Sequence, residues 1–332
     1  MPKKIKVGVL MGGPSAEREI SLITGKAVFD NLDRKKYIPA QIIMAKDSTF
    51  DLVLKNKKTR KLDFVNKDRK LFDIIFIALH GTPGEDGTLQ GLFEMLKIPY
   101  TGPETLSSAL CMNKVYAAQI YIVNGLPTPK FVHFKKSGWK EQKKKVLEDV
   151  KSKIGYPVVL KPVDQGSAVG VTIVKNEVEL VRAVDKTIKK FPWLMAQTFI
   201  RGKEATCGIL EKDGQVMSLP PTHIIANAGE FYDYKSKYGK GGSTHVCPAD
   251  FPEEINKGIE RLAILAHKAL GCRGMSRTDI FYADNAKPGE NLFILETNTI
   301  PGMTPVSLFP EAAGKAGIGF SEMLDLIIEA SV

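Results

Sequence analysis

Four side chains near the C-terminus have the types and spacing of a site for a hard cation. Glu296 and Asn298 stand two residues apart at the end of an apolar stretch, and Arg277 and Asp279 alternate in the same way further upstream. Side chains two apart on a strand point to one face, so each pair presents its polar atoms together. Oxygen ligands of this kind select Mg²⁺ over Zn²⁺. The alternative is a buried salt-bridge network between neighbouring strands.

Two lysines and a glycine-bounded loop form a second set, suited to phosphate. Lys161 ends an apolar strand, and the loop 165–170 that follows offers Ser167 and backbone N–H groups that approach phosphate closely. Lys114 begins a helix after the first domain. Together the lysines suit the phosphates of a nucleotide. Taken alone, Lys161 is explained equally well as a snorkelling lysine in an ordinary hairpin.

Composition limits the classes of protein that remain. The chain has 332 residues with 43% hydrophobic content, enough for two or three domains. No apolar run approaches the roughly 18–20 residues that span a bilayer, and the first residues lack the pattern of a signal peptide. Four cysteines lie far apart with no CxxC pair, which predicts reduced thiols and a cytoplasmic protein.

The net charge of +10 arises largely in local lysine runs without interleaved aromatic residues. This pattern favours a solvated basic face over a nucleic-acid site. A basic surface would also attract an anionic substrate. We therefore expect neither a nucleic-acid nor a membrane partner.

The order of elements predicts an α/β first domain. Strands over 5–10, 37–44 and 72–79 alternate with helices that begin near Ser15 and Gly87, as in a parallel sheet covered by helices. The turn GGPSAE lacks the spacing GxGxxG, so a dinucleotide site is disfavoured.

The remainder of the chain predicts more mixed structure. From about Asn113 it has a helix, a hairpin around the glycine-bounded loop and a basic helix near 140–153. The last part is rich in strands, with a long polar insertion at 229–243, a helix over 253–270 and a final helix near the terminus.

Several motifs taken together resemble the D-alanine–D-alanine ligases, a family of ATP-grasp enzymes. They are MGGPSAEREISLITG (11–25), LHGTPGEDGTLQGLFEMLKIPYTG (79–102), MNK (112–114), LKPVDQGSAVGV (160–171), EFYDYKSKY (230–238), CPADF (247–251), SRTDIF (276–281) and ETNTIPGMTPVSLFP (296–310). The resemblance runs from about residue 5 to about residue 325 in the family's order and spacing.

This resemblance implies an α/β (α+β) fold in three parts. The first is an N-terminal doubly wound parallel-sheet substrate domain over 1–112. Two α+β subdomains of an ATP-grasp fold follow, a central one with the glycine loop over 113–197 and a C-terminal one with the metal and D-alanine sites over 198–332. The implied activity is ATP-dependent ligation of two D-alanines through a D-alanyl phosphate, for peptidoglycan precursor synthesis.

The resemblance also implies a nucleotide and metal site. The metal ligands fall on Asp279, Glu296 and Asn298. Nucleotide contacts fall on Lys114, Lys161, Gly166, Ser167, Gln197, Phe199, Ile200 and Glu204. The implied cofactors are ATP as co-substrate and Mg²⁺ or Mn²⁺, with two ions expected beside ATP and a monovalent cation as a further candidate.

The remaining implied roles concern the two D-alanines. Glu17 would orient the first ammonium, although stabilisation by a helix dipole explains this glutamate about equally well. His80 would lie near the first D-alanine, although a histidine at a strand end often only caps a loop. The other implied groups are a closing pair, Ser167 and Tyr238, a grip on the second carboxylate by Lys237, Ser307 and the Leu308 N–H, and an oxyanion hole of Arg277 and the Gly302 N–H.

Three positions depart from the family pattern. Gln197 stands where a glutamate is common, Asn113 replaces an aspartate, and 163–165 differ from the usual polar run. We expect ATP binding with altered affinity, a supporting contact in doubt at Asn113, and altered kinetics of loop closure.

Two alternative functions remain, a ligase with a different second substrate and a protein that has lost ligase activity. D-lactate or D-serine could replace the second D-alanine, although the Lys237–Tyr238 pair resembles the dipeptide-forming enzymes. An inactive ATP-binding regulator would be expected to lose a metal ligand or Arg277, and the chain has lost neither. The family further implies a homodimer.

Overall fold

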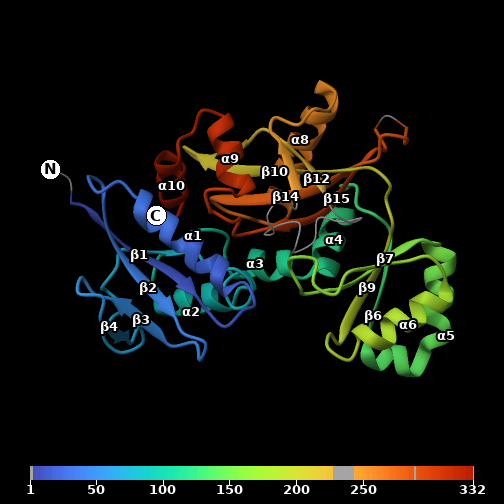
Figure 1. Cartoon of the computed structure of the whole chain (residues 1–332), viewed down its shortest axis with the longest axis horizontal. Helices are drawn as coiled ribbons and strands as arrows, with labels where there is room; N and C mark the ends of the chain where they lie inside the picture. The colour runs from blue at the N-terminus through green and yellow to red at the C-terminus, as the bar shows by residue number, and fades with distance from the viewer. Residues whose placement is uncertain (1–2, 227–242, 288, 332) are drawn as a thin grey trace.

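The computed structural model describes residues 3–226, 243–287 and 289–331 and contains three sheets that follow one another along the chain (Figure 1). The first sheet has the strand order β4-β3-β2-β1-β5. Its strands are β1 (Ile5–Gly12), β2 (Tyr37–Met44), β3 (Phe50–Val53), β4 (Thr59–Leu62) and β5 (Ile74–Ile77). The three predicted strands β1, β2 and β5 run parallel, as expected. Strands β3 and β4 form an antiparallel extension that the sequence analysis did not predict.

Apolar strands at the centre of this sheet hold the first core. Every residue of β5 is buried, as the run Ile74-Ile75-Phe76-Ile77 predicts for an inner parallel strand. Helix α1 (Arg18–Asn31) crosses from β1 to β2 and packs on both strands. Helices α2 (Thr88–Leu96) and α3 (Thr105–Met112) follow β5. This arrangement places the chain after β1 and after β5 at the same end of the sheet, because parallel strands point in one direction.

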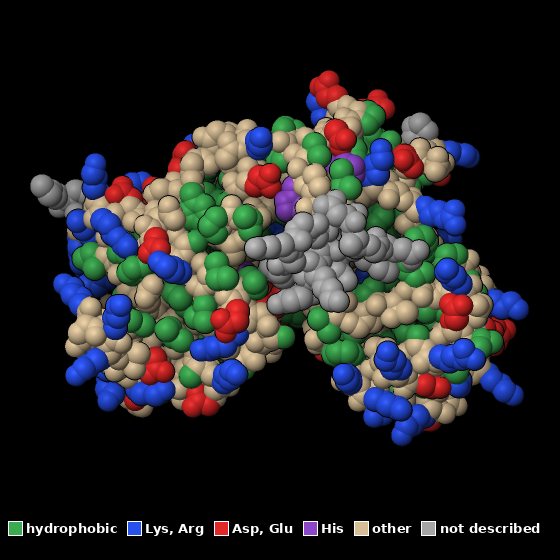
Figure 2. Space-filling view, viewed as in Figure 1, with side chains coloured by type: hydrophobic (Ala, Val, Ile, Leu, Met, Phe, Trp, Pro, Cys, Tyr) green, Lys and Arg blue, Asp and Glu red, His purple; other side chains and the backbone are tan. Residues whose placement is uncertain are grey.

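The second sheet is antiparallel throughout, with the order β6-β9-β7-β8. Its strands are β6 (Phe131–Lys135), β7 (Val158–Pro162), β8 (Thr172–Val174) and β9 (Trp193–Thr198). Helix α4 (Lys114–Val123) precedes it, and helices α5 (Lys136–Lys153) and α6 (Glu177–Thr187) pack against its strands. Lysine side chains gather over this α5–α6 region, at the lower right of the molecule (Figure 2).

The third sheet has the order β13-β12-β10-β14-β15, with β11 paired to β10. Its strands are β10 (Lys203–Lys212), β11 (Gln215–Ser218), β12 (Thr222–Ala226), β13 (Ser243–Val246), β14 (Met275–Tyr282) and β15 (Leu292–Asn298). Helix α8 (Glu253–Ala269) packs on β10, β11, β14 and β15. Its apolar side chains cover one face of the sheet, which leaves the other face for the polar cluster.

The end of the chain differs from the single final helix that the sequence analysis expected. Two helices are present, α9 (Leu308–Lys315) and α10 (Phe320–Glu329). Gly317 between them has a φ of +82°, a left-handed conformation that glycine adopts without steric cost and that commonly ends a helix. Among the described helices, none is long and apolar enough to cross a membrane.

Candidate active site

The strand pair β14–β15 brings together the four polar side chains that the sequence predicts as a cation site. Arg277 lies opposite Asn298, and Asp279 lies opposite Glu296. Directly opposed residues of an antiparallel pair project to the same face, so all four share one face of the third sheet. A register shift follows Asp279, and such bulges bend a strand and re-aim its side chains beside sites.

Each carboxylate of this cluster has a cation beside it. Arg277 donates to both carboxylate oxygens of Asp279, at 3.0 and 3.1 Å. Thr206 of β10 donates to Asp279 Oδ1 at 2.5 Å. Lys114 Nζ lies 3.1 Å from Glu296 Oε2. The salt-bridge network considered from the sequence is therefore present, and it holds both carboxylates in place.

The same donor set fits a hard divalent cation. Two carboxylates and one amide converge, and Asn298 Oδ1 accepts a hydrogen bond from the Ile300 N–H at 2.9 Å. That bond orients the amide and leaves a second lone pair on its oxygen. Mg²⁺ is usually held by one or two carboxylates together with phosphate oxygens and waters. Asp279, Glu296 and Asn298 can supply the protein's share of such a shell.

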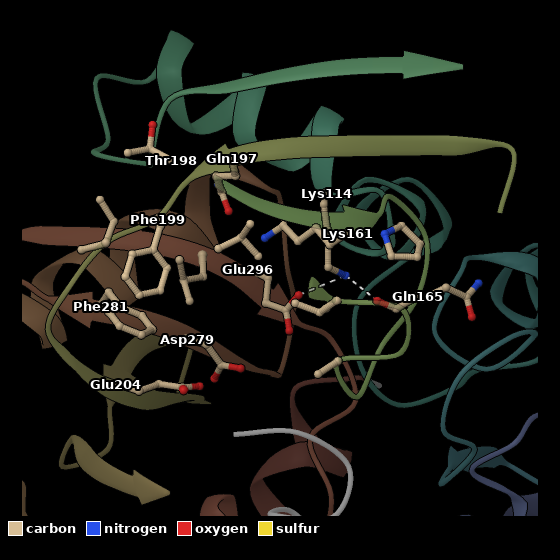
Figure 3. Close-up of a pocket in the computed structure, with 16 residues that line it drawn as sticks. Lys114, Lys161, Gln165, Gln197, Thr198, Phe199, Glu204, Asp279, Phe281 and Glu296 are labelled. Carbon is tan, nitrogen blue, oxygen red and sulfur yellow. Dashed lines mark hydrogen bonds and ion pairs between the residues drawn. The ribbon is translucent and has the colours of Figure 1, made fainter. Parts of the chain in front are cut away.

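A cavity between the second and third sheets adjoins the cluster (Figure 3). It is lined by Lys114, Val159, Lys161, Pro162, Gln165, Ala168, Val171, Gln197, Thr198, Phe199, Ile200, Glu204, Asp279, Phe281, Leu295 and Glu296. Phe199 and Phe281 present their rings to it, and Glu204 lies at the end opposite the two lysines (Figure 3). The cavity thus joins an apolar part to a charged end, as a nucleotide requires.

The two lysines enter this cavity from different elements. Lys114 starts α4 and donates to the Gln165 carbonyl oxygen at 2.6 Å, which ties it to the glycine-bounded loop. Lys161 lies on β7 and is 8% exposed. Burial lowers the pKa of Lys161 to about 8, against the opposing effect of Glu296. Two buried ammonium groups beside one carboxylate leave net positive charge for an anion.

Gln197 lines the cavity and has one buried, unpaired polar atom. The side chain is 3% exposed, and its Nε2 has no hydrogen-bond partner among the described residues. A buried donor left unpaired costs about 1–3 kcal/mol, so such atoms usually serve a ligand or a water. The position that departs from the family pattern therefore still offers a polar contact.

A second cavity lies on the other side of the cluster. It is lined by Glu17, His80, Glu85, Gly166, Ser167, Arg277, Glu296, Asn298, Gly302, Thr304, Val306, Ser307 and Leu308. Eight of these were assigned to the D-alanine or loop contacts from the resemblance: Glu17, His80, Gly166, Ser167, Arg277, Gly302, Ser307 and Leu308. They come from five separated stretches of the chain, and the fold brings them together.

The glycine-bounded loop reaches across to the first domain. Ser167 Oγ donates to Glu17 Oε1 at 2.5 Å, although 150 residues separate them. Ser167 and Ala168 have φ values of +50° and +55°. Non-glycine residues in this left-handed region are strained, and such strain gathers at functional sites. The loop is thus held over the second cavity by a charge-assisted bond at a cost in backbone energy.

His80 and Glu85 supply two titratable groups to this cavity. Burial lowers the pKa of His80, whose Nε2 lies 2.9 Å from Thr24 Oγ1. Burial, and then the nearby Glu17 charge, raises the pKa of Glu85 to about 8. Glu85 Oε2 accepts from the Gly81 N–H at 2.5 Å. Glu85 belongs to the HGTPGEDG motif but was not predicted as a site residue, because a carboxylate just before a helix is usually solvated or stabilises the helix dipole.

The loop before α9 leads into a helix start that offers backbone N–H donors. Ser307 Oγ accepts from the Thr304 N–H at 3.0 Å, and a Cβ added to Gly302 would lie 3.0 Å from that same oxygen. A side chain at Gly302 would therefore crowd Ser307. Leu308 is the first residue of α9, and the first amides of a helix have no partner within it and favour anions.

Three positions named from the sequence, Lys237, Tyr238 and Asn113, are not among the described residues that line the two cavities. Lys237 and Tyr238 lie outside the described residues. Asn113, where the family has an aspartate, is the N-cap of α4, and its Oδ1 accepts from the Val115 and Tyr116 amides at 3.2 and 3.1 Å. Asparagine caps a helix about as well as aspartate, so the substitution leaves the start of α4 in place.

Comparison with known proteins places the chain among ligases. Residues 6–103 match the family model described as D-ala D-ala ligase N-terminus, and residues 121–329 match the model described as D-ala D-ala ligase C-terminus. A relative from Pelotomaculum thermopropionicum, named D-alanine--D-alanine ligase, is 42% identical over 99% of this chain and 97% of its own length. A relative of the same name from Syntrophobacter fumaroxidans is 41% identical over 99% and 98%.

Two solved structures resemble this one over nearly the whole chain. The D-Ala:D-Ser ligase from Enterococcus faecalis has a TM-score of 0.87 and 31% identity, and the match covers 99% of this chain and 100% of that one. The D-alanine--D-alanine ligase from Bacillus anthracis complexed with ATP has a TM-score of 0.76 and 31% identity, over 98% and 97%. The chain belongs to the D-alanine–D-alanine ligase family.

Proposed function

We propose that this protein joins two D-alanines to D-alanyl-D-alanine, with ATP converted to ADP and phosphate, in peptidoglycan precursor synthesis. One observation carries the proposal. Glu296 lines both the cavity that contains Lys114 and Lys161 and the second, polar cavity, so the cluster around it lies where a terminal phosphate and a substrate carboxylate can meet. Membership of the ligase family supports the same activity.

We assign ATP to the cavity between the second and third sheets. Lys114 and Lys161 would contact the phosphates, and Gly166 and Ser167 of the loop would cover them. Gln197, which lines this cavity, would contact the base, with its amide oxygen accepting from the exocyclic amine of adenine. The other contacts we propose for base and ribose are Phe199, Ile200 and Glu204, all of which line this cavity.

Mg²⁺, or Mn²⁺ in its place, would be held by Asp279, Glu296 and Asn298, and we propose that two ions accompany ATP. When bound, such ions would neutralise charge that develops during phosphoryl transfer. A monovalent cation is a further candidate cofactor.

The first step joins the carboxylate of one D-alanine to the γ-phosphoryl group, giving a D-alanyl phosphate and ADP. Glu17 would orient the ammonium of this D-alanine, with His80 beside it. The acyl phosphate reacts readily with water, so the site has to exclude solvent. The bond from Ser167 to Glu17 closes the glycine-bounded loop on this side, and we propose that Tyr238 completes the closure.

The second step joins the amine of the other D-alanine to the acyl carbon. A tetrahedral intermediate forms, and phosphate leaves with the electron pair of its bond to carbon. Arg277 and the Gly302 N–H would stabilise the developing oxyanion. Ser307, the Leu308 N–H and Lys237 would hold the second carboxylate, the first two at the start of α9. Catalysis here comes from positioning and electrostatics, with no covalent enzyme intermediate.

D-serine is the second candidate acceptor, because the D-Ala:D-Ser ligase of E. faecalis has a TM-score of 0.87 against this chain. We favour D-alanine, since the relatives at 42% and 41% identity are both named D-alanine--D-alanine ligase. D-lactate is the remaining alternative.

We further propose the division of the chain at residues 112/113 and 197/198, a homodimer and a cytoplasmic location. Three neighbouring helices expose apolar side chains, Met95 on α2, Leu106 on α3 and Val123 on α4, which are 83%, 70% and 82% exposed. A second copy of the chain would cover them. Supply of ATP and four unbridged cysteines support the cytoplasm.

To test this activity, the purified protein is incubated with Mg²⁺, ATP and D-alanine, and phosphate release and product mass are measured together. We expect phosphate and D-alanyl-D-alanine in equal amounts, and neither with L-alanine. Added D-serine or D-lactate then tests the acceptor by competition. ATP binding without phosphate or dipeptide would refute the ligase activity and leave only the fold.

A further inference from the structure

Two cysteines far apart in the sequence meet at a boundary between domains. Cys111 lies on α3 and Cys272 in the turn after α8, and their Sγ atoms are 3.8 Å apart across 161 residues of sequence. The side chains are buried, 6% and 9% exposed. An S–S bond requires a separation of about 2.05 Å, so a shift of less than about 2 Å joins the two sulfurs.

The surrounding contacts already hold these two segments together. Ser107 of α3 donates to the Gly271 carbonyl oxygen at 2.5 Å. Arg273 donates to the Gly102 carbonyl oxygen at 3.0 and 3.2 Å and to the Tyr100 carbonyl oxygen at 3.1 Å. The sulfur atoms therefore sit in a contact fixed on both sides, and a covalent bond between them needs no new interface.

The active site provides a route for a small molecule to this pair. A third, small cavity is lined by Cys111 together with Lys114, Gly166, Glu296 and Asn298, among others. These four residues, and Glu85 as a fifth, also line the cavities that we assign to ATP or D-alanine. Cys272 does not line it, so a reagent that enters from the active site meets Cys111 first.

We propose that Cys111 and Cys272 form an oxidisable dithiol, which a small peroxide that enters through the active site converts to a disulfide between the first domain and the C-terminal subdomain. The Cys111 thiolate attacks one peroxide oxygen and the O–O bond breaks. The departing hydroxide takes up the proton that the thiol released, which gives a sulfenic acid and water. The Cys272 thiolate then attacks the sulfenic sulfur, the S–OH bond breaks, and the hydroxide takes up the Cys272 proton and leaves as a second water. Two thiols lose two electrons and two protons, and one peroxide becomes two waters.

The bond would act on the nucleotide site through α4. Cys111 is two residues before Asn113, the N-cap of α4, and three before Lys114, which bonds both Glu296 and the Gln165 carbonyl. A shift of α3 toward Cys272 therefore displaces the lysine that ties the loop to the cluster. We expect the disulfide form to bind ATP more weakly and a reductant to restore binding.

The raised pKa of the Cys111 thiol limits the rate of this reaction. The Cys272 hydrogen bond, followed by burial, raises the pKa of the Cys111 thiol, and only the thiolate reacts. The chemistry is therefore slow at neutral pH and accelerates as the pH rises. This pH dependence separates the proposed pair from an exposed, activated cysteine.

The experiment treats the native full-length protein with hydrogen peroxide, blocks the remaining thiols, and maps unreduced peptides by mass. The four free thiols should fall to two, with the Cys111 and Cys272 peptides joined and lighter by two hydrogens. Cys207 and Cys247 are the internal controls, since both are also buried. A link that includes either control at a comparable yield, or four thiols that persist at pH 9, overturns the proposal.

Variants sharpen the result. Cys272→Ser should leave Cys111 as a trappable sulfenic acid without a cross-link, whereas Cys247→Ser should cross-link as the unaltered protein does. ATP with D-alanine should slow the reaction, and a binding titration on the same sample shows whether ATP is bound. If bound ATP does not slow oxidation of the cysteine pair, peroxide does not enter through the active site, and that part of the proposal is refuted. Absence of ATP binding counts instead against the proposed function.

Discussion

The two cavities that meet at Glu296 are built in different ways. The cavity that we assign to ATP has an apolar wall from two antiparallel sheets and two lysines at one end. The cavity that we assign to the D-alanines is ringed by individual polar groups from loops and helix starts, several of them from the part of the chain before α3. Burial shifts the pKa of His80 down and that of Glu85 up in this second cavity. The first cavity therefore suits binding of a large ligand, and the second suits control of charge during a reaction.

This difference predicts that substitutions in the two cavities change different quantities. Loss of a group that faces developing charge should lower kcat, because it stabilises the transition state more than the ground state. Loss of one contact among many around ATP should raise KM for ATP and leave kcat nearly unchanged.

The largest expected effect is at Arg277. Arg277→Gln should lower kcat by about 10²–10³-fold, the size seen when one donor to an oxyanion is removed. Arg277→Lys should recover part of the loss, since it keeps the charge but not the fork that bonds both oxygens of Asp279. Steady-state rates of phosphate release measure this, with ATP affinity from a separate titration. A kcat within about threefold of the original, with ATP bound normally, would remove Arg277 from the reacting centre.

Lys161 tests the other cavity. Lys161→Met should raise KM for ATP by about 10–100-fold, as expected for a lost hydrogen bond to a charged group, while KM for D-alanine stays nearly constant. The pKa of Lys161 is about 8 because burial disfavours its charge, so ATP affinity should weaken as the pH rises above 8. Lys161→Arg keeps its charge at high pH and should lose this dependence. A change confined to kcat would contradict the comparison between the cavities.

Strand periodicity explains why the polar cluster was predictable. Arg277 and Asp279, and likewise Glu296 and Asn298, alternate on strands, and alternation alone assigns each pair to one face. The register that sets Asp279 opposite Glu296 depends on pairing between strands, and no local pattern contains it. The resemblance to a known family supplied that information.

Features that depend on tertiary contacts were harder to predict from the sequence. Glu85 gave no sign of burial, since the enclosing groups Glu17 and Arg277 are distant in sequence. Cys111 and Cys272 read as unrelated thiols for the same reason. The hairpin β3–β4 lies in a polar, lysine-rich stretch, where edge strands carry little hydrophobic pattern. At Asn113 the sequence left a supporting contact in doubt, and the structure shows a helix cap there.

A smaller effect is expected at Gln197. Gln197→Leu should weaken ATP binding by about 3–10-fold, the value of one neutral hydrogen bond. Gln197→Glu restores the residue common in the family and should stay closer to the original. Inosine triphosphate, which lacks the exocyclic amine, provides the control, because discrimination against it should shrink in the leucine variant. Unaltered discrimination would show that Gln197 does not read the base.

The last expected effect concerns the stability contributed by Glu85 rather than the rate of the reaction. Its folded pKa of about 8 lies above the ordinary value of 4.5, so the folded protein keeps a proton that the unfolded chain loses. Stability therefore falls as pH rises from 4.5 to 8, by at most about 1.4 kcal/mol per pH unit. Glu85→Gln keeps a neutral group that can accept from the Gly81 N–H and removes this loss. Thermal unfolding of both proteins between pH 5 and pH 8.5 should show the glutamine variant gaining relative stability up to about pH 8 and no further.

Glu94→Gln is the control, since the Tyr100 hydrogen bond lowers the pKa of Glu94 and its variant should show no such gain. Parallel curves for Glu85→Gln and the original protein would place an ionised Glu85 in the D-alanine cavity at neutral pH, and the contrast in charge control between the two cavities would then rest on His80 and Arg277 alone.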